Sequence, residues 1–249
     1  MKYVSLSDQK VRRLSFYLAM EEFVARHVLG DRPDASLTGE VGLHDCFFMW
    51  QVQPSVIFGR NQVAENEVNV PYCREHGIQV YRRKSGGGCV YADWDNIMLS
   101  YVTTDEHVGF TFNRFVNMEL LVLRKLGIEA TGTTHNDVMI GDRKVSGTAF
   151  YHLPGRSIVH ATLLYDTNME HMLHAITPGP EKLQAKGIES VRQRITLLKD
   201  HTPLSLEEVK TLIRQTLCDG ELVLTPDEVA GIEALEQTYL KEDFIKLLL

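Results

Sequence analysis

Long apolar runs, paired cysteines and an excess of basic residues are all missing from this 249-residue chain. No apolar run approaches the roughly 20 residues that a helix needs to cross a bilayer. Residues 1–13 contain no apolar segment of the length found in secretory signals. We therefore expect a protein without a membrane span, located in the cytoplasm.

The cysteines are widely spaced and form no C-x-x-C pair; they are Cys46, Cys73, Cys89 and Cys218. This spacing favours neither a disulfide framework nor a zinc site, and it is typical of reduced thiols. The formal net charge of −7 argues against a nucleic-acid-binding protein, whose binding surface is usually basic.

Apolar periodicity and turn residues predict strands in the middle of the chain and helices at both ends. Helices are expected over residues 15–30 and 112–126, with Ser15 as the first cap, and after the capping boxes that begin at Ser205 and Thr225. Strands are expected over residues 46–52, 55–58, 78–82, 88–91, 97–102, 138–140, 143–149 and 157–165. With no repeat or long linker, residues 1–249 are predicted to form one α/β (α+β) domain. Its mixed, largely antiparallel β-sheets would be flanked by helices.

The first group of residues that suggests chemistry is the segment Tyr81–Gly88, where basic residues and Ser85 precede three successive glycines. Glycines let the backbone approach a ligand closely, and their N–H groups can form an anion-binding nest. Adjacent arginines add bidentate donors for phosphate or carboxylate. The segment lacks the spacing of a Walker or dinucleotide loop. A triple glycine alone is more often a flexible turn, so both interpretations stay open here.

The second group is His135-Asn136-Asp137, which precedes the segment Arg143–Gly147. Gly141-Asp142 between two extended runs predicts a hairpin. Such a hairpin would return Lys144 toward Asn136 and Asp137 and gather a cation, a carboxylate and an amide. The alternative is a turn with a solvated lysine. No partner at recognised ligand spacing favours a metal ion held by protein side chains alone.

These motifs occur together with several others in one order. Phe16–Glu22, Ile57–Gln62, Arg83–Tyr91, Asn96, Asn136-Asp137, Lys144–Gly147, His160–Leu164 and Lys186–Arg192 follow one another along the chain. This order resembles that of the lipoate–protein ligase A family, including its R-x-S-G-G-G-x-V-[FY] loop and its K-[IV]-[SA]-G segment. The resemblance covers roughly residues 10–240, and it is specific because the motifs are combined.

The resemblance implies the fold of the biotin/lipoate ligase (class II synthetase-like) catalytic domain. It also implies an enzyme that makes lipoyl-adenylate from lipoic acid and ATP with Mg²⁺, and then transfers the lipoyl group to a lysine. Lys144 matches the lysine that stabilises charge in the first step. Asp137 is expected either to orient the acceptor lysine or relay its proton, or instead to hold magnesium. The expected lipoyl-adenylate and ATP contacts are Arg83, Ser85, Gly86, Gly87, Gly88, Cys89, Asn96, Asn136, Ser146, Gly147, His160, Ala161 and Thr162.

The expected acceptors are lipoyl domains of 2-oxoacid dehydrogenase E2 subunits and the glycine cleavage H protein. Because these carriers are usually acidic, Arg82, Lys84 or Arg143 is expected to face the acceptor. Many family members carry a small C-terminal accessory domain, and this chain ends where that domain would begin. The resemblance therefore implies a monomeric catalytic domain that either works with a separate accessory protein or acts mainly as a transferase.

Three alternatives have sequence signals of their own. A lipoyl or octanoyl transferase of the same fold would work through a cysteine thioester, and Cys89 in the glycine loop is its expected nucleophile. A biotin ligase would carry a G-R-G-R-x-G signature, which is absent. A non-enzymatic lipoate carrier would lose the lysine, whereas Lys144 is present.

Overall fold

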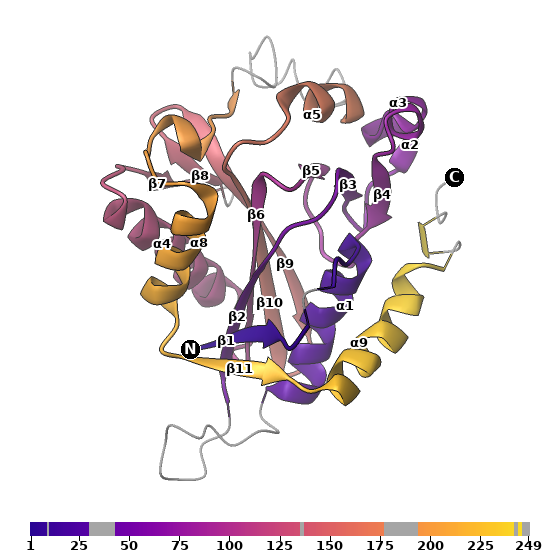
Figure 1. The fold of residues 1–249 in the computed structure, drawn as a ribbon, viewed down its shortest axis with the longest axis vertical. Helices are drawn as coiled ribbons and strands as arrows, with labels where there is room; N and C mark the ends of the chain where they lie inside the picture. Colours follow the sequence, from indigo (N-terminus) through magenta and orange to yellow (C-terminus); the bar gives the residue numbers. More distant parts are fainter. Residues whose placement is uncertain (9, 30–42, 135–136, 177–193, 242–243, 246–249) are drawn as a thin grey trace.

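Two β-sheets form the centre of the molecule, and helices cover them (Figure 1). The structure, a computed structural model, describes residues 1–8, 10–29, 43–134, 137–176, 194–241 and 244–245. The larger sheet has eight strands in the order β11-β1-β2-β6-β10-β9-β8-β7. In chain order they are β1 (Lys2–Leu6), β2 (Asp45–Trp50), β6 (Asn96–Thr103), β7 (Thr131–Gly132), β8 (Asp137–Ile140), β9 (Arg143–Leu153), β10 (Arg156–Leu164) and β11 (Gly220–Leu224).

Strand β1 pairs in parallel with β11 and β2, and the remaining pairs described in this sheet are antiparallel. The predicted mixed, largely antiparallel sheet is therefore confirmed. The smaller sheet has the order β4-β3-β5, with β3 (Ser55–Phe58), β4 (Gln79–Arg82) and β5 (Val90–Ala92). Its outer face packs on α2 (Ala64–Glu67), α3 (Val70–Glu75) and α5 (Met169–Ala175).

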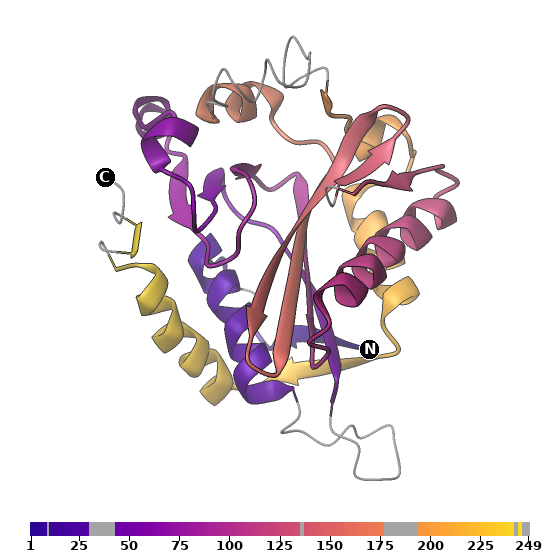
Figure 2. The same ribbon diagram turned by 180° about the vertical axis from the view of Figure 1, so that it is seen from behind.

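Alternating side chains in β10 separate the two faces of the large sheet. Val159, Ala161 and Leu163 pack in the core beneath α4 (Val108–Lys125) and α8 (Leu206–Leu217). Ile158 instead joins the core beneath α1 (Leu14–Phe23), η1 (Val24–Val28) and α9 (Pro226–Tyr239). Figures 1 and 2 show α1 and α9 side by side, with α4 and α8 on the opposite side of the sheet. Even-numbered β10 residues thus lie on the α1 face.

The helix ends follow the local signals in two cases and depart from them in two. Both capping boxes are confirmed, and they start α8 and α9. Ser15, however, does not cap α1: Arg13 occupies that position, and the Ser15 hydroxyl donates to the buried carboxylate of Glu236 on α9 (2.5 Å). A buried carboxylate needs donors, and this long-range partner replaces the local cap. Helix α4 begins earlier than predicted, with His107 as its N-cap.

The edge strand β11, its neighbour β1 and the short helices α2, α3 and α5 were not predicted. A 3-10 turn, η2 (Leu198–Asp200), was also not anticipated. Strands β1 and β11 pair across almost the whole chain, so their strand conformation depends on a partner that local periodicity does not reveal. Among the described residues, no helix is both long and apolar enough to cross a bilayer.

Candidate active site

An extra residue in β9 determines where the Lys144 side chain lies. Val138 pairs with Ser146 and Met139 pairs with Lys144, so Val145 is the unpaired residue of a β-bulge. Val145 packs in the core beneath α4, and the Ser146 hydroxyl donates to Glu119 of α4 (2.5 Å). Because two successive side chains face α4, Lys144 lies on the α1 face. Its Nζ and Cε fill the space that a side chain at Gly147 would need.

The predicted hairpin brings Lys144 to Asp137. The Lys144 Nζ lies 2.7 Å from Asp137 Oδ1, and the two side chains remain 37% and 27% exposed. Asp137 pairs with Gly147 in the sheet, so the ion pair rests on a residue without a side chain. This ammonium is thus held in place and open to an anionic ligand. Asn136, the predicted amide contact, lies outside the described residues, as does His135.

Arg83 supports the glycine loop from within. Its guanidinium donates to the carbonyl oxygens of Ile57 (3.1 Å), Gly86 (2.7 Å) and Gly88 (2.6 Å). Burial lowers the pKa of Arg83 to about 10, so the group still carries its charge at neutral pH. A peptide unit is planar and trans, so its N–H points opposite to its C=O. The amides of Gly87 and Cys89 therefore point away from Arg83, as an anion-binding nest requires.

The Gly59–Gln62 turn holds the other side of this loop. The Arg60 amide donates to the Ser85 carbonyl (2.9 Å), and the Gln62 side chain accepts from the Gly59 amide (2.8 Å). A methyl group at Gly59 would lie 2.5 Å from the backbone oxygen of Gly87. The Gly-Arg-x-Gln motif thus has a physical reason: only glycine lets the loop pack this closely.

Ser85, at the start of the loop, bonds directly to β10. Its Oγ lies 2.8 Å from Nε2 of His160, whose Nδ1 lies 3.0 Å from Oε2 of Glu21 on α1. All three side chains are largely buried. The sequence singled out Ser85 and His160, but it did not assign a role to Glu21. The only signal was that Glu21 falls within the family's first-helix motif.

One face of the large sheet gathers these groups. His160 pairs with Ala149, and Thr162 pairs with Gly147, two residues further along. A methyl group at Gly87 would lie 3.6 Å from Cβ of Ala149, so the loop packs over this point of the sheet. The glycine loop, the His160 imidazole and the Lys144 ammonium are therefore neighbours on the α1 face.

Besides Arg83, whose guanidinium bonds to loop carbonyls, four predicted contacts have side chains that lie away from the site. The side chains of Ser146 and Ala161 face α4, on the opposite side of the sheet. Asn96 is fully buried and donates to the Tyr91 carbonyl and the Thr167 hydroxyl. Cys89 packs against the cluster beneath α2, α3 and α5, and burial raises its thiol pKa to about 12. These side chains support the site rather than line it.

Glu119 was not among the predicted site residues. It is buried on α4, beneath strand β9, which carries Lys144. Its Oε1 accepts from Ser146, whereas Oε2 has no partner among the described residues. Burial raises the pKa of this carboxyl to about 7, opposed in part by the Ser146 hydrogen bond and the Lys144 charge. The sequence of α4 around Glu119 has ordinary helix periodicity, so nothing in it indicated a buried carboxyl group.

Three cations were expected to face an acceptor, and two of them, Arg82 and Lys84, bind partners within the protein instead. Arg82 donates to the carbonyls of Arg60 and Gln62, and Lys84 forms an ion pair with Glu22 (2.6 Å). Arg143 is exposed at the tip of the hairpin beside Lys144. Of these three residues, Arg143 on the hairpin is therefore the one that is placed to contact an acceptor protein.

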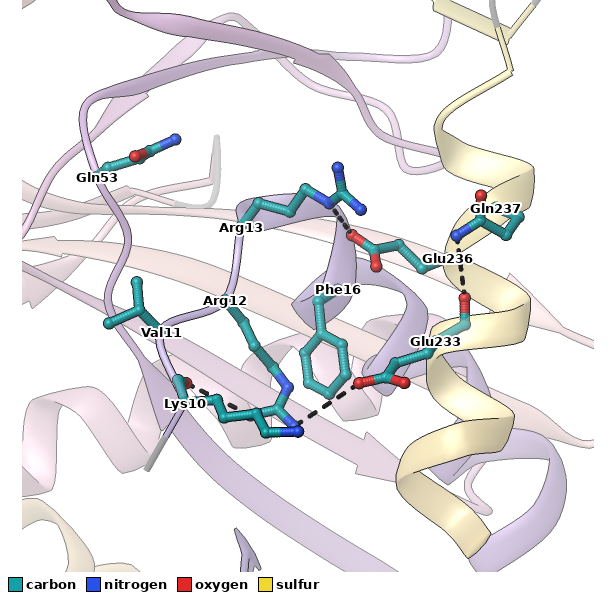
Figure 3. A pocket seen from close by; sticks show the side chains of 9 residues that line it. All are labelled: Lys10, Val11, Arg12, Arg13, Phe16, Gln53, Glu233, Glu236 and Gln237. Carbon is teal, nitrogen blue, oxygen red and sulfur yellow. Dashed lines mark hydrogen bonds and ion pairs between the residues drawn. The ribbon is translucent and has the colours of Figure 1, made fainter. Parts of the chain in front are cut away.

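A cavity of about 540 Å³ lies between the start of α1 and α9 (Figure 3). Its lining residues are Lys10, Val11, Arg12, Arg13, Phe16, Gln53, Glu233, Glu236 and Gln237. Arg13 is paired with Glu236 (2.8 Å), and Arg12 with Asp8 (2.5 Å). Both guanidinium groups are therefore already paired with carboxylates. None of the predicted site residues lines the cavity.

The chain is similar to known proteins over most of its length. The lipoyl protein ligase A/B catalytic domain matches residues 14–218. Lipoate–protein ligase 1 of Staphylococcus aureus is 32% identical over 243 residues, which cover 94% of this chain and 70% of that protein. Two further ligases match over 56% and 52% of their own length.

Solved structures share the fold over the whole chain. A bipartite lipoate protein ligase from Thermoplasma acidophilum, studied with its E2 lipoyl domain, is 27% identical with a TM-score of 0.81, covering 100% of this chain and 96% of its own. A lipoate-protein ligase A bound with ATP is 25% identical with a TM-score of 0.82, covering both chains fully. The chain therefore belongs to the lipoyl protein ligase A/B catalytic-domain family.

Proposed function

We propose that this enzyme attaches lipoate to a specific lysine of lipoyl carrier domains, through a lipoyl-adenylate formed with ATP. The observation that carries the proposal is the Lys144 ammonium. It is fixed over Gly147 beside Asp137, on the same sheet face as the glycine loop. A related ligase is described with ATP bound and another with lipoic acid bound, and both share this fold.

The first step brings the carboxylate of lipoate against the α-phosphate of ATP, and these two anions repel each other. A cation that is already in place stabilises the charge that develops between them without reorganising. Lys144 supplies this cation, and the outward amides of Gly87 and Cys89 supply neutral donors. Arg83 contributes indirectly, because its donors hold the loop carbonyls away from the ligand.

The second step requires a neutral amine on the acceptor. With a pKa of ~10.4, about one lysine in a few thousand is neutral at pH 7. Asp137 lies beside the Lys144 ammonium and is accessible, so we assign it the task of orienting the acceptor lysine or receiving its proton. An Asp137→Asn enzyme should then modify the acceptor slowly even when lipoyl-adenylate is supplied. Transfer from lipoyl-adenylate at the wild-type rate would remove Asp137 from this step.

Magnesium accompanies the nucleotide in this proposal. No group of three or more His, Cys, Asp or Glu side chains in the described ranges could hold a metal ion. Magnesium in ATP sites is commonly bound by phosphate oxygens, water and only one or two carboxylates. Asp137 could supply one such oxygen, which fits a metal ion that arrives with ATP.

We propose lipoyl domains of E2 subunits as the acceptors, and the glycine cleavage H protein as a further one. A related archaeal ligase was studied with its E2 lipoyl domain, which supports this class of partner. Arg143, exposed beside the site, would meet an acidic carrier. Arg143→Glu should weaken acceptor binding and reduce its salt dependence, whereas unchanged binding would contradict this docking role.

We further propose that the chain acts as a monomeric catalytic domain in the cytoplasm, and that a separate accessory protein assists the activation of free lipoate. The four free cysteines fit a reducing compartment. A transferase that works through Cys89 is disfavoured, because burial keeps that thiol protonated at neutral pH.

The experiment combines two reactions. Wild-type enzyme, Lys144→Ala and the exposed control Lys125→Ala are incubated with lipoic acid, MgATP and a lipoyl domain, and acceptor modification is read by intact mass. Lipoyl-adenylate replaces lipoic acid and ATP in parallel, which separates a complete ligase from a transfer-only enzyme. Lys144→Ala should lose pyrophosphate release by roughly 10³-fold or more, because removing one preorganised donor already costs about 10²–10³. Wild-type pyrophosphate release by Lys144→Ala would overturn the proposal.

A further inference from the structure

A continuous chain of buried hydrogen bonds ends at Ser85. The Trp50 indole donates to the Ser100 hydroxyl (2.9 Å), which donates to Glu21 Oε1 (2.6 Å). The carboxylate of Glu21 contacts His160 Nδ1 (3.0 Å to Oε2), and His160 Nε2 meets the Ser85 hydroxyl (2.8 Å). Two donors thus fix the orientation of the Glu21 carboxylate, which in turn fixes the imidazole.

The chemistry of the partners determines which atoms carry protons. Trp50 can only donate, and it occupies the acceptor side of the Ser100 hydroxyl. A carboxylate only accepts, so His160 presents an N–H at Nδ1 to Glu21. In the neutral imidazole, Nε2 then has a free lone pair directed at Ser85. This is the arrangement of an activated nucleophile, namely a hydroxyl, a base within hydrogen-bond reach and a carboxylate that orients the base.

The two backbone amides that follow Ser85 in the chain are the candidate donors for a developing oxyanion. The carbonyl of Ser85 accepts from Arg60, and the carbonyl of Gly86 accepts from Arg83, so the amides of Gly86 and Gly87 point away from those partners. Neither amide donates to another described residue in the structure. Gly87 and Gly88 are exposed, so an acyl group can reach this end of the loop. The serine and the candidate oxyanion donors therefore lie within two residues of one another in the glycine loop, and the base reaches the serine from β10.

We propose that Ser85, His160 and Glu21 form an acyl-transfer triad, and that the enzyme hydrolyses medium-chain acyl esters without ATP. Ser85 and His160 are the catalytic residues, and Glu21 is a positioning residue. The preference for a medium-length chain rests on the proposed function, because the same pocket would hold the lipoyl chain. The triad itself rests only on the hydrogen-bond geometry.

The reaction proceeds in two balanced steps. Ser85 Oγ bonds to the ester carbonyl carbon, and its proton moves to His160 Nε2. The C–O bond to the leaving group then breaks, the leaving oxygen keeps the electron pair and takes that proton from His160, and the alcohol or phenol departs. Water then attacks the acyl–Ser85 ester and gives its proton to His160. His160 returns a proton to Ser85 Oγ as the ester bond breaks, and the free acid is released.

The test uses p-nitrophenyl octanoate as the ester and a fluorophosphonate as the covalent probe, both without ATP. The full chain should release p-nitrophenolate and form a mass adduct on the peptide that contains Ser85. Ser85→Ala should lose hydrolysis by about 10³-fold or more and should lose the adduct. His160→Gln should lose about 10²-fold or more. The exposed control Ser7→Ala should match the wild type.

The role of Glu21 is tested separately from folding. Glu21→Gln keeps the shape of the side chain, so kcat should fall by about 10²-fold or more while KM is unchanged, because Glu21 does not touch the acyl group. A change in KM alone, or in neither constant, would overturn its positioning role. Should Ser85→Ala fail to fold, the site of the fluorophosphonate adduct on the wild-type chain decides the question.

The outcomes also separate the triad from the proposed function. Ligation of a lipoyl domain without ester hydrolysis or a Ser85 adduct would overturn the triad, leaving Ser85 as a hydrogen-bond donor to the substrate. Ester hydrolysis without any ligation, including from lipoyl-adenylate, would overturn the ligase and leave the triad. Hydrolysis that persists in Ser85→Ala would overturn the triad alone.

Discussion

Replacing Gly147 with alanine would displace the Lys144 ammonium without removing any functional group. The added methyl would lie 2.5 Å from Cε of Lys144 and closer still to Nζ, whereas ordinary contact begins at 3.4 Å. The end of the lysine must therefore move by about 1 Å. Displacements of this size in a catalytic arrangement cost about 10²-fold in rate. Because the displaced atoms end a flexible side chain, the free energy of unfolding should change by less than about 1 kcal/mol.

Pyrophosphate release from lipoic acid and ATP measures the effect on rate, and urea unfolding measures the effect on stability. Gly109→Ala is the matched control, because no atom lies within 4 Å of its added methyl. Gly147→Ala should reduce the rate by about 10²-fold, while Gly109→Ala should not. A wild-type rate in Gly147→Ala would refute the conclusion that Lys144 acts from its position over Gly147. A loss that merely tracks unfolding would refute it equally.

Further predictions concern the buried groups. Glu119 has its pKa raised by burial to about 7, so the stability that its neutral form contributes is complete below about pH 4.5 and is lost as pH rises through 7. The free energy of unfolding of the wild type should therefore fall between pH 5 and pH 8 by about 2 to 3 kcal/mol more than that of Glu119→Gln, as measured by urea titration. An equal fall in both proteins would contradict the raised pKa of Glu119. Cys89→Ser should keep wild-type ligation in the intact-mass assay, and loss of an acyl–enzyme adduct together with activity would instead favour a thioester. Tyr239→Phe removes the hydroxyl that donates to Glu22 (2.9 Å), so the unfolding free energy should fall by about 2 kcal/mol, and an unchanged value would show that this bond adds no net stability.

Local patterns predicted much of the fold because their causes are local. The capping boxes at Ser205 and Thr225 satisfy amides within three residues, so the sequence alone shows them. The Gly141-Asp142 turn likewise predicted the hairpin that returns Lys144 to Asp137. Ser15 shows the limit, because its hydroxyl bonds to Glu236, 221 positions away, rather than capping its own helix.

The candidate site likewise combines features that the sequence predicts with features that only the tertiary structure decides. The sequence by itself determined which residue types are present and in what order. That order identified the family and predicted the chemistry of Lys144 and the glycine loop. Only the tertiary structure decided which side chains share a face. A single unpaired residue, Val145, turns Lys144 toward α1 while leaving Ser146 beneath α4. The tertiary structure also decided that Glu21 lies within hydrogen-bond distance of His160, 139 positions away. Strand register and long-range hydrogen bonds produce these contacts, and neither depends on the periodicity of a single segment.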